Sequence, residues 1–189
     1  MRLLVATQNE FKKKEIHAIL DGQFEVISLK DLNDADEVSE TGDTFFENAL
    51  LKASYFAKKH QMLTIADDSG LCVAALNGAP GIFSARYSGL GDQGNIDLLL
   101  DELSGISYRN AYFISVVVLY DPKTDTYQTF KGEVHGEITH ERKGHNGFGY
   151  DPIFYIPSLE KTMAEIEPTL KNRMSHRALA LASLKEALK

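Results

Sequence analysis

The stretch Leu63-Thr64-Ile65-Ala66-Asp67-Asp68-Ser69-Gly70-Leu71 passes from an apolar run to two carboxylates, a hydroxyl and a glycine. The apolar run predicts a buried strand that ends at Asp67 and Asp68. Two adjacent carboxylates are both buried and ionised only when a cation or strong donors lie nearby. The stretch therefore predicts a ligand site at a strand end of an α/β protein, with Mg²⁺ as one suitable partner. The alternative is a surface turn, because Asp, Ser and Gly are typical turn residues.

The composition is that of a soluble globular protein. Of 189 residues, 43% are hydrophobic and 25% are charged, so the chain can bury a sizeable core. The net charge of −7 argues against a partner such as a nucleic-acid backbone or an anionic membrane. The single cysteine, Cys72, excludes an internal disulfide, and no apolar run reaches the roughly 18 residues of a membrane span. We therefore expect a cytoplasmic protein.

The N-terminal segment predicts a phosphate site. Leu3–Ala6 is typical of a buried strand, and a helix is expected to follow Thr7–Lys12 and to end near Leu20. A strand-to-helix turn presents backbone N–H groups and the positive end of a helix dipole, which favour a bound phosphate. Lys12 adds a positive charge where the dipole itself disfavours one, which indicates an anionic ligand.

A second strand is predicted over Phe24–Leu29, followed by an acidic segment from Asp31 to Asp43 whose charges we expect to be mostly solvated. Thr44 and Glu47 have the spacing of a capping box, which predicts a helix that extends to about Lys59. Because the strand that carries Asp68 follows directly, we expect Glu40, just before the helix, to lie near Asp68.

The rest of the chain predicts strands over Ala111–Tyr120 and Thr126–Ile138, paired antiparallel, and a short strand over Ile153–Ile156. A helix is expected near Leu159–Ile166. Ser175 is expected to cap the last helix, and this would gather Lys171, His176 and Arg177 at one helix N-terminus.

Six sequence blocks, taken together, resemble the signature of the inosine/xanthosine triphosphate pyrophosphatase family, also called the HAM1/RdgB-like noncanonical purine NTP pyrophosphatases. They follow the family's order and cover nearly the whole chain. The blocks are Thr7-x-Asn9-x-x-Lys12, Glu40-Thr-Gly-x-Thr44-Phe-x-Glu47-Asn48-Ala, Ala66-Asp67-Asp68-Ser69-Gly70-Leu71, Gly78-Ala-Pro-Gly81-x-x-Ser84-Ala-Arg86-Tyr87, Phe148-Gly-Tyr-Asp151-Pro and Ser175-His176-Arg177.

The resemblance implies hydrolysis of ITP, dITP or XTP to the monophosphate and pyrophosphate with Mg²⁺. It implies an ITPase-like α/β fold in one domain, residues 1–189, with a long mixed β-sheet flanked by helices, two lobes and a central cleft, assembled as a homodimer. By position, Glu40 and Asp68 resemble the metal ligands, and Asp68 also resembles the catalytic proton acceptor. The positions that resemble substrate-binding residues are Thr7, Gln8, Asn9, Glu10, Phe11, Lys12, Ser69, Phe148, Gly149, Tyr150, Asp151, Lys171, His176 and Arg177.

The chemistry of these residues agrees with that expectation. Phosphoanhydride hydrolysis needs neutralised phosphate charge and an oriented water. Lys12 and Lys171 are expected to contact phosphate oxygens, with Asp67 and Glu47 in supporting roles. Arg177 and protonated His176 would donate to the carbonyl at C6 of hypoxanthine or xanthine, although Arg177 beside a phosphate is an alternative. Phe148 or Tyr150 would stack on the purine.

Two other functions fit part of the sequence. A phosphatase with an aspartate nucleophile would use a strand-end carboxylate, but its haloacid dehalogenase pattern places one residue between the two aspartates. A non-catalytic purine nucleotide sensor would keep the base pocket without hydrolysis. The presence of both Glu40 and Asp68 favours the enzyme.

Overall fold

The computed structural model describes residues 2–20 and 22–188. The two ends of the predicted domain, Met1 and Lys189, lie outside these residues. The chain divides into two compact units, which are unit 1 (Met1–Asp68, Ser115–Gly132 and His176–Lys189) and unit 2 (Ser69–Ile114 and Glu133–Ser175). Whether they act as one domain stays a prediction.

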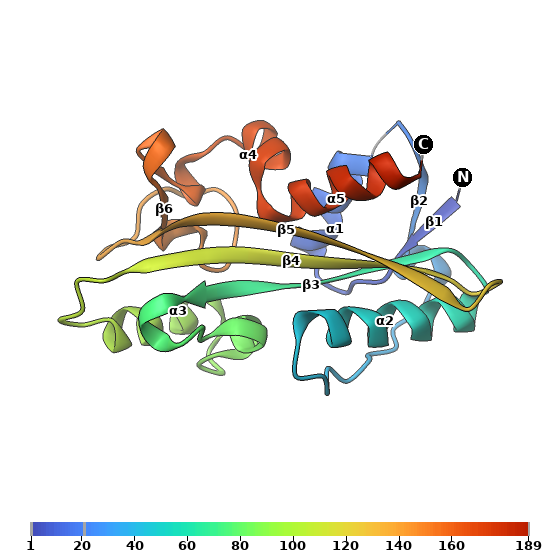
Figure 1. Cartoon of the computed structure of the whole chain (residues 1–189), viewed down its shortest axis with the longest axis horizontal. Helices are drawn as coiled ribbons and strands as arrows, with labels where there is room; N and C mark the ends of the chain where they lie inside the picture. Colours follow the sequence, from blue (N-terminus) through green and yellow to red (C-terminus); the bar gives the residue numbers. More distant parts are fainter. Residues whose placement is uncertain (1, 21, 189) are drawn as a thin grey trace. The chain divides into compact units, whose positions relative to one another are not determined.

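The elements follow this division (Figure 1). Unit 1 contains β1 (Arg2–Val5), α1 (Glu10–Leu20), β2 (Glu25–Ser28), the 3₁₀ helix η1 (Lys30–Leu32), α2 (Phe45–His60) and α5 (His176–Ala187). Unit 2 contains η2 (Ala74–Leu76), η3 (Gly81–Arg86), α3 (Gly91–Glu102), η4 (Asp151–Ile153), β6 (Phe154–Ile156), η5 (Pro157–Leu159), β7 (Lys161–Thr162), η6 (Met163–Glu165) and α4 (Pro168–Met174). Three strands contribute residues to both units, namely β3 (Thr64–Val73), β4 (Asn110–Asp121) and β5 (Thr126–Ile138).

The strands form a mixed sheet, as predicted. Among the described residues it has seven strands in the order β2-β1-β3-β4-β5-β6-β7. β1 pairs in parallel with β2 and β3, whereas β6 pairs antiparallel with β5 and β7. None of the described helices is long and apolar enough to cross a membrane.

The strands of unit 1 contribute side chains to two hydrophobic cores, one on each face of the sheet. Because successive strand residues point to opposite faces, Leu4 and Ala66 pack with Phe56 and the small residues of α2, while Leu3 and Ile65 pack with α1 and α5. Figure 1 shows α2 on one side of these strands and α1 with α5 on the other. Both faces are covered, which explains why these strands read as continuous apolar runs.

Unit 2 has its own core. Leu71 on β3 and Ile96 on α3 are fully buried in it, together with Phe113 and Phe154, whose ring centroids lie 4.5 Å apart. Tyr150 belongs to the same core and is 4% exposed. The end of β3 that belongs to unit 2 is therefore packed against α3, β4 and β6.

The predicted end of the third strand is wrong. β3 does not stop at Asp67 but continues through both carboxylates to Val73. Asp67 and Asp68 are buried, so the surface-turn alternative is also wrong. Turn propensity is overruled here because cations of unit 1 pair with these carboxylates, which lets the strand remain extended.

Two predictions near the C-terminus also fail. The helix expected over Leu159–Ile166 is instead β7 followed by η6, because Lys161 and Thr162 pair with β6 and Thr162 caps the short 3₁₀ turn with Glu165. Lys171 does not join His176 and Arg177 at one helix N-terminus. It lies in α4, whose last residue is Met174, whereas His176 begins α5.

Candidate functional site

Asp67 is surrounded by positive charge. Lys12 Nζ lies 2.8 Å and Arg177 Nη2 3.2 Å from its Oδ2, and the Ser115 hydroxyl donates to its Oδ1. Burial alone would raise the pKa of Asp67, but the Arg177 and Lys12 charges outweigh it and hold the pKa well below its ordinary value. Asp67 is therefore an ionised anchor for two cations, the largely buried Lys12 and the fully buried Arg177.

Both cations depend on this anchor. The Arg177 side chain is 1% exposed and also donates to Glu15 on α1. Burial opposes its charge, yet Asp67 and Glu15 raise the pKa of Arg177. Burial lowers the pKa of Lys12 despite Asp67. The assignment of Arg177 to substrate stays a prediction, since the structure gives its guanidinium two carboxylate partners.

Asp68 has a different environment. Its Oδ1 lies 3.6 Å from Lys52 Nζ, whereas its Oδ2 is buried and has no hydrogen-bond partner among the described residues. Burial raises the pKa of Asp68, and the attraction of Lys52 offsets this only in part. A buried carboxylate oxygen without a donor is costly, so a further cation would stabilise it.

Glu40 and Asp68 meet at one ammonium group. Lys52 Nζ lies 2.6 Å from Glu40 Oε1 and donates to the main-chain oxygen of Asp67 at 3.0 Å. The prediction that Glu40 lies near Asp68 is confirmed, because both contact Lys52.

These two carboxylates fit a divalent metal ion. Within residues 2–20 and 22–188, no three His, Cys, Asp or Glu side chains gather in a group that would hold a metal alone. Mg²⁺ needs no such cage, because it binds one or two carboxylates and completes its shell with water and phosphate oxygens. The bare Oδ2 of Asp68 and the nearby Glu40 supply that donor set.

The loop before α1 is held by its own side chains. Asn9 Oδ1 accepts from the N–H groups of Phe11 and Lys12 at 2.9 and 3.1 Å, and Thr7 Oγ1 accepts from Asn9 N–H. Asn9 therefore caps α1 and aims Lys12 inward. Gln8 donates to main-chain oxygens of the acidic segment at Asp34 and Asp36, while Glu10 and Phe11 are exposed.

The predicted purine loop lies in unit 2. Asp151 Oδ2 accepts from Phe148 N–H at 2.9 Å and from Lys171 Nζ at 2.6 Å, and this Nζ lies 5.0 Å from the Phe148 ring centre. Gly149 N–H donates to Asp92. Lys171 is thus buried against Asp151, and a phosphate contact for it stays a prediction.

Tyr150 is less suited to stacking than Phe148. Its hydroxyl donates to the Ser84 main-chain oxygen at 2.9 Å, and its ring belongs to the unit 2 core, whereas Phe148 is half-buried. His176 is buried in α5, and Ser69 follows Asp68 on β3.

Sequence reasoning missed three contributors, which are Lys52, Ser115 and Glu15. Lys52 lies one turn after Asn48 on α2, next to the buried Ala53. A lysine beside a small-residue stripe and a serine inside the most apolar strand were the available signals. Glu15 follows Lys12 by three residues, a spacing typical of a solvated helix face.

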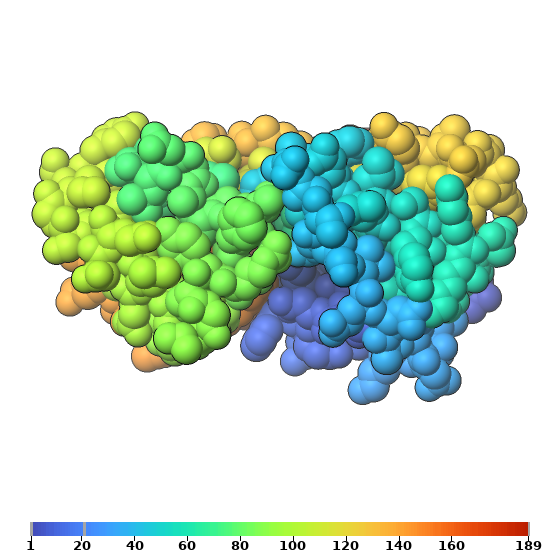
Figure 2. Space-filling model, turned by 90° about the horizontal axis from the view of Figure 1, so that it is seen from below, coloured from blue at the N-terminus to red at the C-terminus, as the bar shows by residue number. Residues whose placement is uncertain are grey.

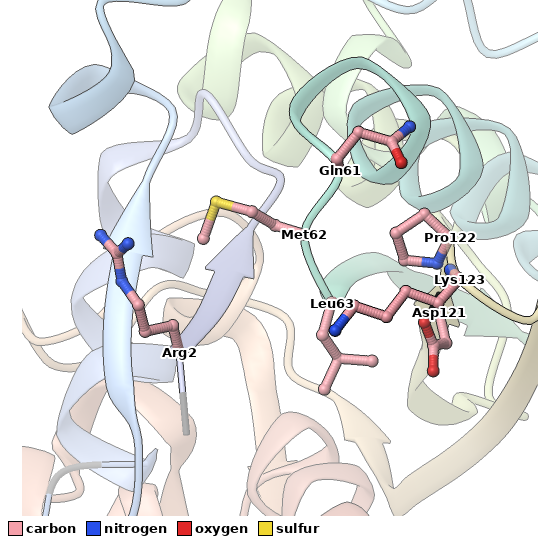
Figure 3. Close-up of a pocket in the computed structure, with 7 residues that line it drawn as sticks. All are labelled: Arg2, Gln61, Met62, Leu63, Asp121, Pro122 and Lys123. Carbon is pink, nitrogen blue, oxygen red and sulfur yellow. Dashed lines mark hydrogen bonds between the residues drawn. The ribbon is translucent and has the colours of Figure 1, made fainter.

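A pocket of about 350 Å³ lies elsewhere in unit 1. Figure 3 shows Arg2, Met62, Leu63 and the Asp121–Lys123 turn around it. It contains none of the predicted site residues, so it has no part in the candidate site.

Comparisons with known proteins place the chain among proteins of one family. A protein of Staphylococcus epidermidis named dITP/XTP pyrophosphatase is 49% identical over 188 residues, which cover 98% of this chain and 95% of that protein. A Geobacter sulfurreducens protein of the same name is 49% identical over 192 residues, covering 99% and 96%. The solved Ham1 protein of Staphylococcus aureus superposes with a TM-score of 0.90 at 43% identity, covering 100% of this chain and 98% of that one.

A solved HAM1 protein from Coxiella burnetii gives a TM-score of 0.91 at 41% identity, with 100% of this chain and 98% of that chain covered. The sequence profile of the Ham1 family matches residues 3–187. The resemblance drawn from the six sequence blocks is thereby confirmed, and the chain belongs to the Ham1 family.

Proposed function

We propose that the protein hydrolyses noncanonical purine nucleoside triphosphates, namely ITP, dITP and XTP, to the monophosphate and pyrophosphate. One observation carries the proposal. Glu40 and Asp68 converge on Lys52, and a buried oxygen of Asp68 has no donor among the described residues. The curated relatives named dITP/XTP pyrophosphatase support the choice of substrate class.

In the proposed reaction, a water oxygen forms a bond to the α-phosphorus. The bond from the α-phosphorus to the oxygen that bridges the α- and β-phosphates breaks, so that pyrophosphate leaves. Mg²⁺, when bound by Glu40 and Asp68, would neutralise charge that develops on the phosphates. Asp68 would orient the water and accept its proton. This assigns catalysis to a group that the rest of unit 1 leaves incompletely paired.

Lys12 would bind the phosphates. An ammonium group has three N–H donors, and the described contacts of Lys12 Nζ include one carboxylate oxygen, of Asp67. A phosphate oxygen would then meet a cation that Asp67 already holds in place. The leaving pyrophosphate is stabilised by such a preorganised charge.

We assign the purine to the unit 2 loop, with Phe148 as the stacking residue. The Asp151 bridge to Phe148 N–H and Lys171 fixes the loop that carries the ring. Use of Mg²⁺ and assembly as a homodimer are further parts of the proposal that follow from the resemblance. A cytoplasmic location is a further part that follows from the composition and the single cysteine.

The test is incubation of the purified protein with ITP and Mg²⁺, with ATP as the comparison substrate and products separated by anion exchange. We expect IMP with pyrophosphate. Inorganic phosphate with IDP would instead indicate a phosphatase, and unchanged ITP would indicate a nucleotide sensor. The Glu40→Gln variant, which keeps the side-chain size, should lose the activity.

Hydrolysis in ¹⁸O-labelled water locates the bond that forms. Attack at the α-phosphorus places the label in IMP. A label found in pyrophosphate would overturn the arrangement in which Lys12 binds the leaving group.

A further inference from the structure

The segment that carries Glu40 runs backwards along α2. We call residues 33–44 the Glu40 loop. Figure 2 shows this part of the chain (light blue) beside α2 (cyan to teal) on the surface of unit 1. The loop has no regular secondary structure. Holding Glu40 in one place therefore requires side-chain contacts that offset the lost backbone entropy.

The first anchor lies at the end of α2. The Asp34 side chain is 3% exposed, and Lys59 Nζ lies 2.9 and 2.8 Å from its two oxygens. His60 Nε2 lies 2.6 Å from Asp34 Oδ2. Asp36 adds bonds from Lys59 and from the Tyr55 hydroxyl. An acidic segment that was expected to be solvated is thus paired here.

The second anchor lies at the start of α2. Asn48 Oδ1 accepts from Gly42 N–H at 2.9 Å, and Glu47 Oε2 accepts from Asp43 and Thr44 N–H at 2.7 and 3.1 Å. A Cβ on Gly42 would lie 2.5 Å from Glu47 Cβ. Only glycine therefore lets the loop approach the helix this closely.

The helix residues that hold the loop form one stripe. Asn48, Lys52, Tyr55 and Lys59 are spaced by four, three and four residues, which places them on one face of α2. Their respective partners on the loop are Gly42, Glu40, Asp36 and Asp34, so the loop runs antiparallel to the helix. Lys59 is about 10 Å from Lys52 along the helix axis, so it acts at a distance from Glu40.

We propose that Lys59 and Asp34 are positioning residues for Glu40, and that their ion pair sets the affinity of the metal site without touching it. The inference rests on the proposed role of Glu40 as a metal ligand. Residues that hold a ligand in place commonly decide how well a metal site binds. The Gln8 bonds to the Asp34 and Asp36 main chain tie the same anchor to the loop that leads to Lys12.

The test compares two neighbouring lysines in the full-length protein. Lys59→Met removes the ammonium that holds Asp34 and keeps the aliphatic stem. Lys58→Met is the matched control, because Lys58 makes an exposed ion pair with Asp125 at 2.9 Å, outside the Glu40 loop. Hydrogen exchange of amides 37–43 is measured without metal, Mn²⁺ binding is measured directly, and ITP hydrolysis is titrated with Mg²⁺.

In Lys59→Met we expect faster exchange in 37–43, and roughly tenfold weaker Mn²⁺ binding with a matching rise in the Mg²⁺ needed for half-maximal rate. The kcat at saturating Mg²⁺ should stay within about threefold of wild type, since a full metal site restores Glu40. Lys59→Arg should recover the affinity, and Lys58→Met should match wild type.

The inference is overturned if Lys59→Met binds Mn²⁺ as tightly as wild type, or if Lys58→Met weakens binding equally. Faster exchange with unchanged metal affinity would also overturn it, because the ion pair would then order the loop without affecting how Glu40 binds the metal. Failure of the proposed function is a separate result, in which wild type binds Mn²⁺ but leaves ITP intact.

Discussion

Asp67 and Asp68 are neighbours on β3, but their side chains lie on opposite sides of the strand in opposite electrostatic environments. On one side, Asp67 is met by Lys12, Arg177 and a serine hydroxyl, and its pKa is lowered. On the other, Asp68 keeps a buried oxygen without a described donor, and its pKa is raised. Lys12 and Arg177 both pair with Asp67, whereas Asp68 has one described ion pair, with Lys52. An imbalance of this kind is typical of a group that meets a ligand, and we propose this role for Asp68, with Asp67 as its structural neighbour.

The largest expected effect is on the Asp68 side. Asp68→Asn should lower kcat/KM for ITP on the order of 10⁴-fold at saturating Mg²⁺, because the charge that would hold the metal is worth several kcal/mol in the transition state. Its metal-free melting temperature should stay near that of wild type, since little else in unit 1 depends on the missing charge.

Steady-state rates and thermal unfolding of metal-free protein check this together. An Asp68→Asn enzyme with wild-type turnover would remove the central assignment. A large loss of stability would mean that Asp68 is as structural as Asp67.

Asp67→Asn should show the reverse pattern in stability. Asp67→Asn takes a carboxylate charge away from Lys12 and from the fully buried Arg177, and breaking a buried ion pair in this way costs roughly 3–5 kcal/mol of unfolding free energy. Urea denaturation of the metal-free variant beside Asp68→Asn measures the contrast directly. Equal losses in the two variants would erase the distinction between the two sides of β3.

Much of the fold and part of the candidate site could be predicted from the sequence. Apolar runs predicted β1 and the start of β3, and Thr44 with Glu47 predicted the start of α2. The approach of Glu40 to Asp68 followed from their order along the chain. These predictions rest on local patterns, which a single sequence carries well.

The missed features depend on contacts that are distant in sequence. Arg177 lies 110 residues from Asp67, so no local pattern reveals that it pairs there. Without that pairing, Asp67 and Asp68 looked like the end of a strand. Lys52 resembled a solvated helix residue, because the carboxylates that bind it lie on other segments.

A third buried carboxylate, Asp34, is expected to stabilise the fold through its charge. Hydrogen bonds from Lys59 and from the main chain of Asp36, with a smaller contribution from His60, lower its pKa to about 2. A lowered folded pKa means that the stabilisation is complete above the unfolded value near 4 and is lost as pH falls towards 2.

Wild type should therefore exceed Asp34→Asn in unfolding free energy by at most about 2 kcal/mol at neutral pH, and most of this difference should be lost by pH 2. Urea unfolding from pH 7 to 2 measures it, and Glu37→Gln, an exposed residue of the same loop, is the control. A difference that is independent of pH would show that Asp34 stabilises by packing, not by charge.

The smallest effect distinguishes two roles for Arg177. The sequence assigned it to the purine, which predicts that a change at Arg177 lowers ITP hydrolysis far more than ATP hydrolysis. The structure places its guanidinium between Asp67 and Glu15, and this favours a positioning role. Lysine keeps the charge but cannot bridge two carboxylates with a planar fork. Arg177→Lys should then lower kcat/KM for both nucleotides by the same factor, roughly tenfold, through a less well-placed Lys12.

A double-mutant cycle with Asp67→Asn separates this role from a direct phosphate contact, which would also lower both rates equally. If Arg177 acts through Asp67, the second substitution adds little to the first, because residues in one ion-pair network are coupled. Fully additive losses would place Arg177 on the phosphates. If Arg177→Lys alone strongly lowers the ratio of kcat/KM for ITP to that for ATP, Arg177 contacts the purine base. Asp67 would then be the counterion of a residue that binds the purine.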